Sequence, residues 1–327
     1  MISIGITDHL EGPWERDSAT VYAEVSDLVS LADLLGVDYF WFSEHHAHAH
    51  YGHLPTPLLL ALHLAGKTNR IRLGTAIICL NLHHPLDVAE QVAVADVLSG
   101  ARMVAGFGSG STPEEFELFG LKETADAERH ARFETALGVI LGHWRGEGNE
   151  AGRMLPAAAS DLPGRSWLAV NSAGSARIAG RLGFGMLFSH LRTPAQYREY
   201  RDAYAQAGGR GLVAANRPVY VGEDDEKAWA EAGTAVRMLW RRFRTEGKIP
   251  KETPEPQSPR EMCGHPLNFI VGGAETVARE LLALHKEAPF DVANLEVRWD
   301  GLSHALVRGS LQRLAERVGP QLRHHTG

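Results

Sequence analysis

One short stretch of this sequence concentrates side chains that can transfer protons or bind a metal ion. Glu44 and five histidines occur within residues 44–53, directly after the apolar run YFWF. An imidazole titrates close to neutral pH, so His45 could act as a general acid or base, and the neighbouring Glu44 could fix its tautomer. Because alternate residues of an extended segment share one face, the histidines at 46, 48 and 50 could instead bind a metal.

These readings of the histidine stretch can be ordered. For His45, the sequence favours a role in proton transfer over a solvated loop, and a solvated loop over a metal site. For the histidines within residues 48–53, the sequence favours a solvated loop. A metal-dependent hydrolase would need further ligands after later strands, where the sequence offers His190 and Asp300 but no convincing lysine or second histidine in order. We therefore predict no metal.

A second segment, NSAGSARIAG at residues 171–180, joins an apolar run to a helical pattern. Small residues allow a close approach to the backbone, and the free N–H groups of a helix N-terminus favour an anion. Helix capping by serine is the alternative, and spacing alone leaves both open. Five residues could take part: Asn171, Ser172, Ala173, Gly174 and Ser175. Arg129, on an earlier helical pattern, could add a phosphate contact, although arginines on helices are usually solvated.

Strand and helix patterns alternate along the whole chain. Apolar runs predict eight strands, at residues 2–7, 39–44, 71–80, 101–110, 166–171, 185–190, 216–223 and 292–299. Helical spacing of apolar residues predicts a helix after each strand, and a further one at residues 272–288. Eight such units favour a (β/α)8 TIM barrel as a single domain over residues 1–327, with an open doubly wound sheet as the alternative.

One long stretch interrupts this alternation. Residues 247–268, GKIPKETPEPQSPREMCGHPLN, are rich in proline and charge and form a long insertion between the seventh and eighth strands. A loop of this length is unusual in a barrel, so we interpret it as a mobile lid or a disordered excursion. In barrels, functional side chains follow the carboxyl ends of the strands, which here draws attention to Asp8, Glu44 and His190.

Composition excludes several classes of function. The net charge of −7 and the pI near 6.2 argue against nucleic acid and acidic membranes as partners. No uninterrupted apolar run reaches the roughly 18 residues that a membrane span needs, and the N-terminal residues do not resemble a signal peptide. The two cysteines, Cys79 and Cys263, are far apart. We expect a reduced, cytoplasmic protein.

Several motifs together resemble the bacterial luciferase-like flavin monooxygenases. They are FSEHH, RIRLGTAI, HHPLDVAEQVAVADVLSGAR, EEFELFG, AVNSAGSARIAGRLG and VGGAETVARELLAL, and their order matches over nearly the whole chain. The resemblance implies a (β/α)8 barrel that binds FMN at the carboxyl ends of its strands. It also implies that a separate flavin reductase delivers reduced FMN, which reacts with oxygen to oxidise a small organic substrate.

The resemblance also assigns roles to residues. His45 matches the first histidine of the family's EHH motif and would be an acid or base. Ala76 and Ile77 match a pair joined by a non-proline cis peptide under the flavin ring. Ser172, Ser175 and Arg129 match phosphate contacts. The substrate pocket would be walled by Phe42, Ala76 and Cys79.

Two positions depart from luciferase. Ser109, within GFGSGS, stands where luciferase has an arginine against the flavin, and Asn171 stands where it has a glutamate. Charge-assisted bonds are worth about 1.5–3 kcal/mol, so the loss of one would weaken FMN binding. Weaker binding suits an enzyme that takes reduced flavin as a diffusing substrate.

Three alternatives remain open: a deazaflavin-dependent oxidoreductase, a non-catalytic flavin-binding or partner subunit of the same fold, and a metal-dependent hydrolase. The second and third predicted helices are apolar on more than one face. Together with the resemblance, this pattern predicts a homodimer through these helices.

Overall fold

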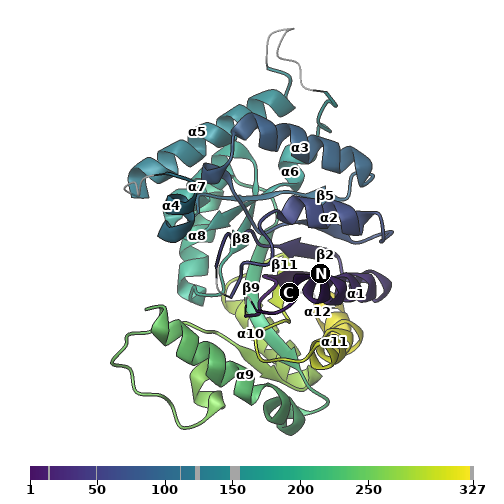
Figure 1. Cartoon of the computed structure of the whole chain (residues 1–327), viewed down its shortest axis with the longest axis vertical. Coiled ribbons are helices and arrows are strands. Elements are labelled where there is room, and N and C mark those ends of the chain that lie inside the picture. The colour runs from purple at the N-terminus through teal and green to yellow at the C-terminus, as the bar shows by residue number, and fades with distance from the viewer. Residues whose placement is uncertain (14, 49, 111, 122–125, 148–154, 325–327) are drawn as a thin grey trace.

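The structure is a computed structural model of the chain, and it describes all residues except 14, 49, 111, 122–125, 148–154 and 325–327. Its strands are β1 (Ser3–Asp8), β2 (Tyr39–Phe42), β3 (Arg72–Thr75), β4 (Ile78–Cys79), β5 (Met103–Val104), β6 (Gly106–Gly108), β7 (Trp167–Val170), β8 (Gly185–Phe188), β9 (Val213–Val221), β10 (Ile270–Gly272) and β11 (Val292–Glu296). All pair in parallel and form one curled sheet, consistent with a TIM-like barrel (Figure 1). The pairing order is β4-β6-β7-β8-β9-β11-β1-β2-β3-β5, and β10 pairs with β9.

Helices cover the outside of this sheet (Figure 1). They are α1 (Ser18–Leu34), α2 (Pro57–Ala65), α3 (Pro85–Leu98), α4 (Pro113–Leu118), α5 (Asp126–Trp144), α6 (Leu162–Arg165), α7 (Ala173–Leu182), α8 (Pro194–Gln206), α9 (Asp225–Thr245), α10 (Ala274–Glu287), α11 (His304–Arg313) and α12 (Gly319–His324). Several begin with proline, whose fixed φ suits the first helical turn. The described part of the chain contains no helix long and apolar enough to cross a membrane.

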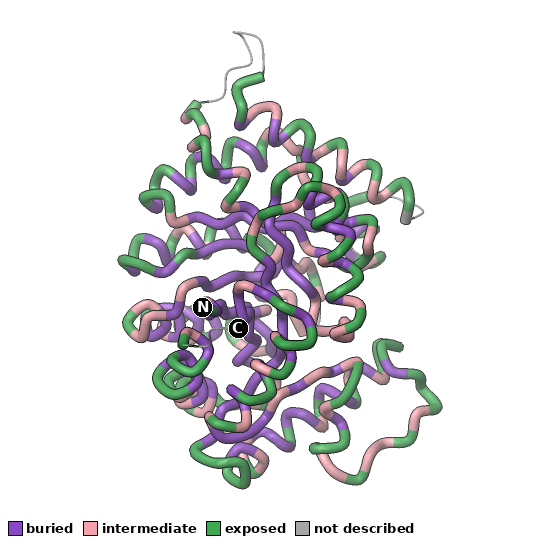
Figure 2. The backbone as a smooth tube through the Cα atoms, turned by 180° about the vertical axis from the view of Figure 1, so that it is seen from behind, coloured by how far each residue is buried: buried purple, intermediate pink, exposed green. Residues whose placement is uncertain are grey.

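Strand β2 shows how the sequence separates two packing layers. Its side chains alternate, because successive Cβ atoms of a strand point to opposite faces. Tyr39 and Trp41 stack with ring centroids 4.8 Å apart, and Trp41 meets the edge of Trp167 at 5.6 Å, inside the curled sheet. Phe40 and Phe42 pack in the main core beneath the helices. Figure 2 shows the strands as the buried part of the chain.

The packing of the Trp41 ring inside the sheet requires a glycine in β1. A Cβ atom at Gly5 would lie 2.3 Å from Cζ3 of Trp41, so only glycine fits opposite this indole. The inside of the sheet is therefore filled by side chains at this level, and in barrels the functional site lies beyond the carboxyl ends of the strands.

The insertion predicted at residues 247–268 lies between α9 and β10, beside α9 in Figure 1. It contains a short 3-10 helix, Pro259–Cys263. Glu255 pairs with Arg237 at 2.7 Å and with Arg241 at 2.8 Å, both on α9. These contacts attach the segment to α9; its motion stays a prediction.

Several elements differ from the sequence prediction. The predicted strand at residues 71–80 is divided into β3 and β4, and the predicted strand at residues 101–110 is divided into β5 and β6. Strand β9 begins at Val213, three residues before the predicted start, and the short β10 and α4 were not predicted. The PEEFEL segment of α4 carries too many glutamates for an apolar helical pattern, yet Pro113 starts a helix of six residues there.

Candidate active site

His45 follows β2 and is oriented by a carboxylate from α4. Its Nδ1 lies 3.1 Å from Oε1 of Glu115, which also accepts the backbone N–H of His46 at 3.0 Å. Burial acts to raise the pKa of Glu115, but the hydrogen bonds from His45 and His46 outweigh it and lower the pKa. Glu115 therefore favours its ionised form and accepts a hydrogen bond from Nδ1–H of His45, which leaves Nε2 without that proton. The orienting group is Glu115 and not Glu44.

Glu44 binds two other histidines. Its Oε1 accepts hydrogen bonds from Nε2 of His46 at 2.9 Å and from Nε2 of His83 at 2.8 Å. Its Oε2 accepts a hydrogen bond from the backbone N–H of Cys79 at 3.2 Å. Burial opposes ionisation of Glu44, but both histidines lower its pKa, and the bond to Glu44 raises the pKa of His83. The ligand atoms of these three residues lie within 4.8 Å of one another and could hold a metal ion.

A third carboxylate, Glu296 at the end of β11, collects three donors on one oxygen. Oε1 lies 3.2 Å from Nε2 of His9, 3.0 Å from Nδ1 of His190 and 2.7 Å from Nδ2 of Asn216. Burial acts to raise the pKa of Glu296, but His190 and His9 hold it well below its ordinary value. Burial likewise lowers the pKa of His9, but Glu296 overcomes this effect and raises it. His9 also bonds Ser43 Oγ through Nδ1 at 2.8 Å.

Of these groups, His9, His45, His190 and Glu296 line one cavity of about 150 Å³. Its polar and titratable lining residues are His9, Glu11, His45, Tyr51, His190, Arg242, Lys248 and Glu296. Its apolar lining residues are Leu191, Pro218, Leu239, Phe243, Phe269 and Trp299. A cavity that combines apolar side chains with convergent polar groups is typical of a site for a small molecule.

Arg242 and Tyr51 close the cavity on the side of α9. Nη2 of Arg242 donates to Oε1 of Glu11 at 3.1 Å and to the Tyr51 hydroxyl at 2.6 Å. The guanidinium lies over the Tyr51 ring at 4.8 Å. Burial, followed by the charge on Glu11, keeps the pKa of Tyr51 well above its ordinary value, so the hydroxyl stays protonated.

The structure brings the predicted cofactor residues to neighbouring strand ends. The peptide bond between Ala76 and Ile77 is cis and lies between β3 and β4. Nδ2 of Asn81 donates to the carbonyl of Ser109 at 2.9 Å and to that of Arg129 at 3.1 Å, which joins the loop after β6 to α5.

The segment Asn171–Ser175 caps α7. The Ser172 hydroxyl accepts the backbone N–H of Ser175 at 3.1 Å, and the Ser175 hydroxyl accepts the backbone N–H groups of Asn171 and Ser172. Asn171, Ser172 and Gly174 are exposed, Ala173 is half-buried and Ser175 is buried. The structure confirms that these serines cap the helix. The first turn is exposed, so its backbone N–H groups that lack a partner within the helix remain available to an anion.

The predicted pocket residues separate into two groups. His45 and His190 line the cavity, and Glu44 lies in the network behind His46. Asp8 is buried and binds Nε of Arg298 at 3.0 Å, so it supports the strand end without lining the cavity. Phe42 and Cys79 are also buried and do not line it, and burial raises the pKa of the Cys79 thiol.

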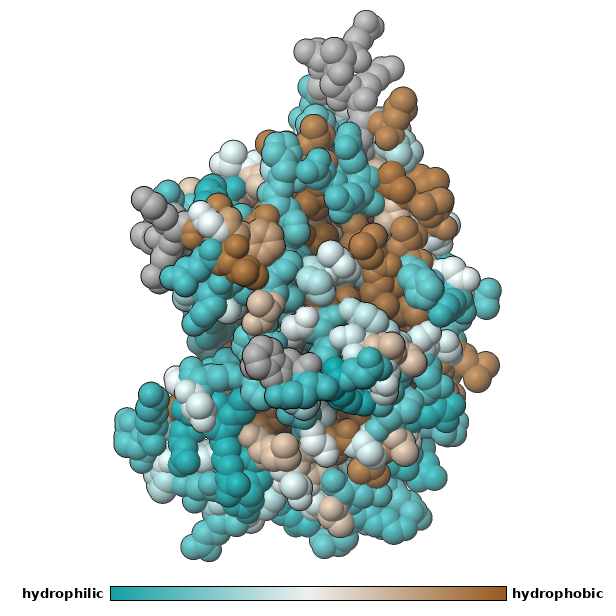
Figure 3. All heavy atoms as spheres, in the orientation of Figure 1, coloured by the Kyte–Doolittle hydropathy of each residue, from teal (hydrophilic) through white to brown (hydrophobic). Residues whose placement is uncertain are grey.

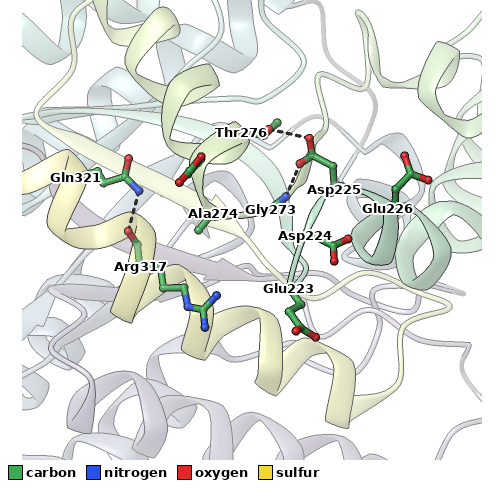
Figure 4. Close-up of a pocket in the computed structure, with 10 residues that line it drawn as sticks. Glu223, Asp224, Asp225, Glu226, Gly273, Ala274, Thr276, Arg317 and Gln321 are labelled. Atoms are coloured by element: carbon green, nitrogen blue, oxygen red, sulfur yellow. Dashed lines mark hydrogen bonds between the residues drawn. The ribbon is translucent and has the colours of Figure 1, made fainter.

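A larger hollow, of about 610 Å³, lies elsewhere and shares no lining residue with the histidine cavity. Figure 4 shows its acidic rim at the starts of α9 and α10. There Asp225 accepts the backbone N–H of Gly273 at 2.7 Å and the Thr276 hydroxyl at 3.0 Å. These carboxylates stabilise the N-termini of α9 and α10, because negative charge is favourable at the start of a helix.

Sequence reasoning missed Glu115, Glu296, His83 and the pair formed by Tyr51 and Arg242. Glu296 carried a usable signal, because a charged residue inside the apolar strand VANLEV needs a buried partner. Glu115 and Arg242 carried none, since both lie in helical segments rich in charge.

Comparisons with known proteins show the family of this chain. The sequence model of the luciferase-like monooxygenase family matches residues 4–318. The oxygenase component of the flavin-dependent trigonelline monooxygenase of Acinetobacter baylyi is 23% identical over 94% of this chain and 91% of that protein. An F420-dependent glucose-6-phosphate dehydrogenase of Beutenbergia cavernae is 31% identical over 48% of this chain and 49% of that protein.

Solved structures show the same fold. The monooxygenase RslO1 of Streptomyces bottropensis aligns with a TM-score of 0.82 at 24% identity, over 98% of this chain and 99% of that chain. The oxygenating constituent of 3,6-diketocamphane monooxygenase of Pseudomonas putida, in complex with FMN, aligns with a TM-score of 0.78 at 17% identity, over 98% of both chains.

Proposed function

Because the chain belongs to the family of luciferase-like monooxygenases, we propose that it is an FMN-dependent oxygenase of the two-component type. It uses reduced FMN from a separate reductase, together with oxygen, to oxidise a small organic molecule. The observation that carries this proposal is His45, which lines a small cavity at the strand ends and is oriented by a buried, ionised Glu115. The name of the trigonelline relative, an oxygenase component, supports the separate reductase.

The residues near the strand ends fit FMN. The exposed first turn of α7, with Ser172 and Gly174, suits the phosphate, because its N–H groups and the helix dipole favour an anion. A Cβ at Gly174 would meet nothing nearer than Ser172 Oγ at 3.6 Å, so the backbone there is open to a ligand. Arg129, on α5, would add a phosphate contact, and Asn171, Ala173, Ser175 and Ser109 would complete the cofactor site. Ala76 and Ile77 would lie beneath the flavin ring.

The chain's own side chains handle protons and exclude water. When bound, reduced FMN would supply the electrons that activate oxygen. His45 would give or take a proton at Nε2, and Glu115 would keep the ring in one tautomer. The apolar wall with Phe243, Phe269 and Trp299 would keep water from the reacting groups.

Two further proposals concern the whole chain. Residues 247–268 would act as a lid, because Lys248 already lines the cavity at the start of this segment. A homodimer would form through α2 and α3, where Figure 3 shows apolar side chains gathered on the surface, among them Leu59, Val97 and Leu98. The closed (β/α)8 barrel and a cytoplasmic location belong to the same proposal.

A deazaflavin-dependent oxidoreductase is the second candidate. It is favoured by the F420-dependent relative in the same comparison. Such an enzyme would transfer hydride and would not need oxygen. The adjacent histidines at 45 and 46 favour the monooxygenase over the deazaflavin-dependent oxidoreductase.

A titration of the purified protein separates the two candidates. Oxidised FMN, anaerobically reduced FMN and the deazaflavin F420 are added in parallel, and absorbance and fluorescence are recorded. We expect preferential binding of reduced FMN and a changed flavin spectrum when oxygen is admitted. Preferential binding of F420 would instead establish the second candidate, and binding of neither would reject both.

A further inference from the structure

Two of the histidines that line the cavity share one arrangement. Nδ1 of His45, which follows β2, is hydrogen-bonded to Glu115 at 3.1 Å. Nδ1 of His190, which follows β8, is hydrogen-bonded to Glu296 at 3.0 Å. Hydrogen bonds and nearby histidines lower the pKa of both carboxylates, so both stay ionised and accept a hydrogen bond from a ring N–H group. A neutral imidazole with its proton on Nδ1 has a lone pair on Nε2. The cavity therefore offers two hydrogen-bond acceptors.

Two acceptors select the chemistry of the ligand. A carboxylate or a ketone can only accept hydrogen bonds and would face the two lone pairs without a donor. A hydroxyl group donates, so it satisfies either imidazole. Leaving a buried acceptor unpaired weakens binding by about tenfold, which is enough to discriminate between these ligands.

The apolar part of the lining and the volume of the cavity limit the size of the ligand. Phe243, Phe269 and Trp299 are among the apolar lining residues, and the cavity volume is about 150 Å³. An apolar cavity of about 150 Å³ in another protein holds one benzene molecule. A molecule with a single six-membered ring therefore fits this cavity.

Two cations, Arg242 and Lys248, also line the cavity, and the Arg242 side chain is only 9% exposed. Arg242 pairs with Glu11 and Lys248 pairs with Glu246. Glu296 raises the pKa of His9, which lines the same cavity, against the effect of burial. A negative oxygen formed in the cavity would be stabilised by these groups.

We propose that this cavity binds a single-ring molecule with an ionisable hydroxyl group, a phenol or an enol, and that Nε2 of His190 accepts the hydroxyl proton. The O–H bond of the ligand breaks, an N–H bond forms on His190, and the electron pair stays on the ligand oxygen. Glu296 stabilises the resulting imidazolium. As the substrate of an oxygenase this ligand rests on the proposed function, but its binding and ionisation need no flavin.

His190 is the better acceptor of the two for a geometric reason. Its side chain is 16% exposed, against 25% for His45, so its lone pair is better shielded from water. Its ring also lies nearly parallel to Phe243, with centroids 6.2 Å apart, so a ligand ring packed on the apolar wall lies beside it.

The test uses 4-nitrophenol, which ionises near neutral pH and whose anion absorbs visible light. It is titrated against the flavin-free protein about one pH unit below its own ionisation midpoint, with nitrobenzene as the matched ring without a hydroxyl. We expect the bound probe to show the anion spectrum, and nitrobenzene to bind about tenfold more weakly, as the loss of one hydrogen bond predicts. A bound probe that stays neutral, or equal binding of nitrobenzene, would overturn the proposal.

Variants test the role of His190. We expect His190→Gln to reduce the fraction of bound anion about tenfold, whereas His50→Gln, on the loop that follows His45 and outside the cavity lining, leaves it unchanged. Glu296→Gln keeps His190 but removes the charge that stabilises its protonated form, so it also reduces the anion, and this variant decides the matter if His190→Gln does not fold. Anion formation that survives both changes would remove His190 from the proposal.

The flavin titration keeps the two proposals separate. If 4-nitrophenol ionises on the protein but no flavin binds, the substrate class holds and the proposed function is wrong. If reduced FMN binds but the probe does not, the function holds and the phenol assignment is wrong.

Discussion

Glu115 decides what His45 can do, although 70 positions separate the two residues. A histidine in a solvated loop exchanges tautomers, whereas a hydrogen bond to a buried carboxylate holds one of them. The same arrangement recurs at Glu44 and at Glu296, so three buried carboxylates orient His45, His46, His83, His9 and His190.

We expect Glu115→Gln to destabilise the protein by about 1–3 kcal/mol at pH 7, because hydrogen bonds to a charged acceptor are lost. The pKa of Glu115 is lowered in the folded protein, so its contribution is fully present above the unfolded pKa, near 4.3, and is lost as the pH falls below that value. The difference between wild type and variant should therefore shrink below about pH 4.3. Urea unfolding at pH 7 and below pH 4 measures this change.

Glu114→Gln is the matched control, because Glu114 is exposed on the same helical turn. It should change stability by less than about 0.5 kcal/mol at either pH. An equal loss in both variants would mean that the bond to His45 contributes nothing specific.

At the scale of elements, short segments hold the site in place. The six residues of α4 place Glu115 beneath His45, and the capping box of Ser172 and Ser175 defines the start of α7. The 247–268 segment is tied to α9 through Glu255, whose bonds to Arg241 and Arg237 lower its pKa to about 2.

We expect Ser175→Ala to lower the free energy of unfolding by about 0.5–2 kcal/mol, because its hydroxyl accepts two backbone N–H groups at the start of α7. Ser30→Ala, on the exposed face of α1, should have little effect. Thermal unfolding of both variants measures the difference. Equal midpoints would show that the cap does not stabilise α7.

We expect Glu255→Gln to release the 247–268 segment from α9, because the variant loses its charge and with it both ion pairs. Trypsin should then cleave after Lys251 several times faster than in wild type. Glu252→Gln, within the same segment, is the control and should leave the rate unchanged. If the rates agree, Glu255 does not anchor the segment.

At the scale of the whole molecule, exposed apolar side chains concentrate over α2 and α3 (Figure 3). Leu59 is 66% exposed, Val97 59% and Leu98 68%. Apolar patches of this kind mark interaction surfaces, and the proposed homodimer would cover them.

We expect wild type to have the mass of two chains in solution and Val97→Glu to have the mass of one, because a buried unpaired charge opposes association. Met238→Glu, at an exposed apolar position on α9, should leave the mass unchanged. Size-exclusion chromatography with light scattering measures all three proteins. A monomeric wild type would refute the proposed dimer.

The sequence by itself determined the α/β class and the parallel order of the strands. A near-continuous apolar run, such as residues 71–80, is typical of a strand buried on both faces, and the helical segments between the strands require crossovers. It also placed His45 and His190 at strand ends. These features follow from local periodicity, which is why they can be read without the fold.

Only the tertiary structure decided which carboxylate meets which histidine. Glu44 is adjacent to His45 in sequence but binds His46 and His83, while Glu115 and Glu296 reach their histidines across 70 and 106 positions. Likewise Phe42 lies at a strand end, but the alternation of β2 turns it towards the helices and away from the cavity. Hydrogen-bond partners and the direction of a side chain depend on the angles between elements, and a linear pattern does not contain those angles.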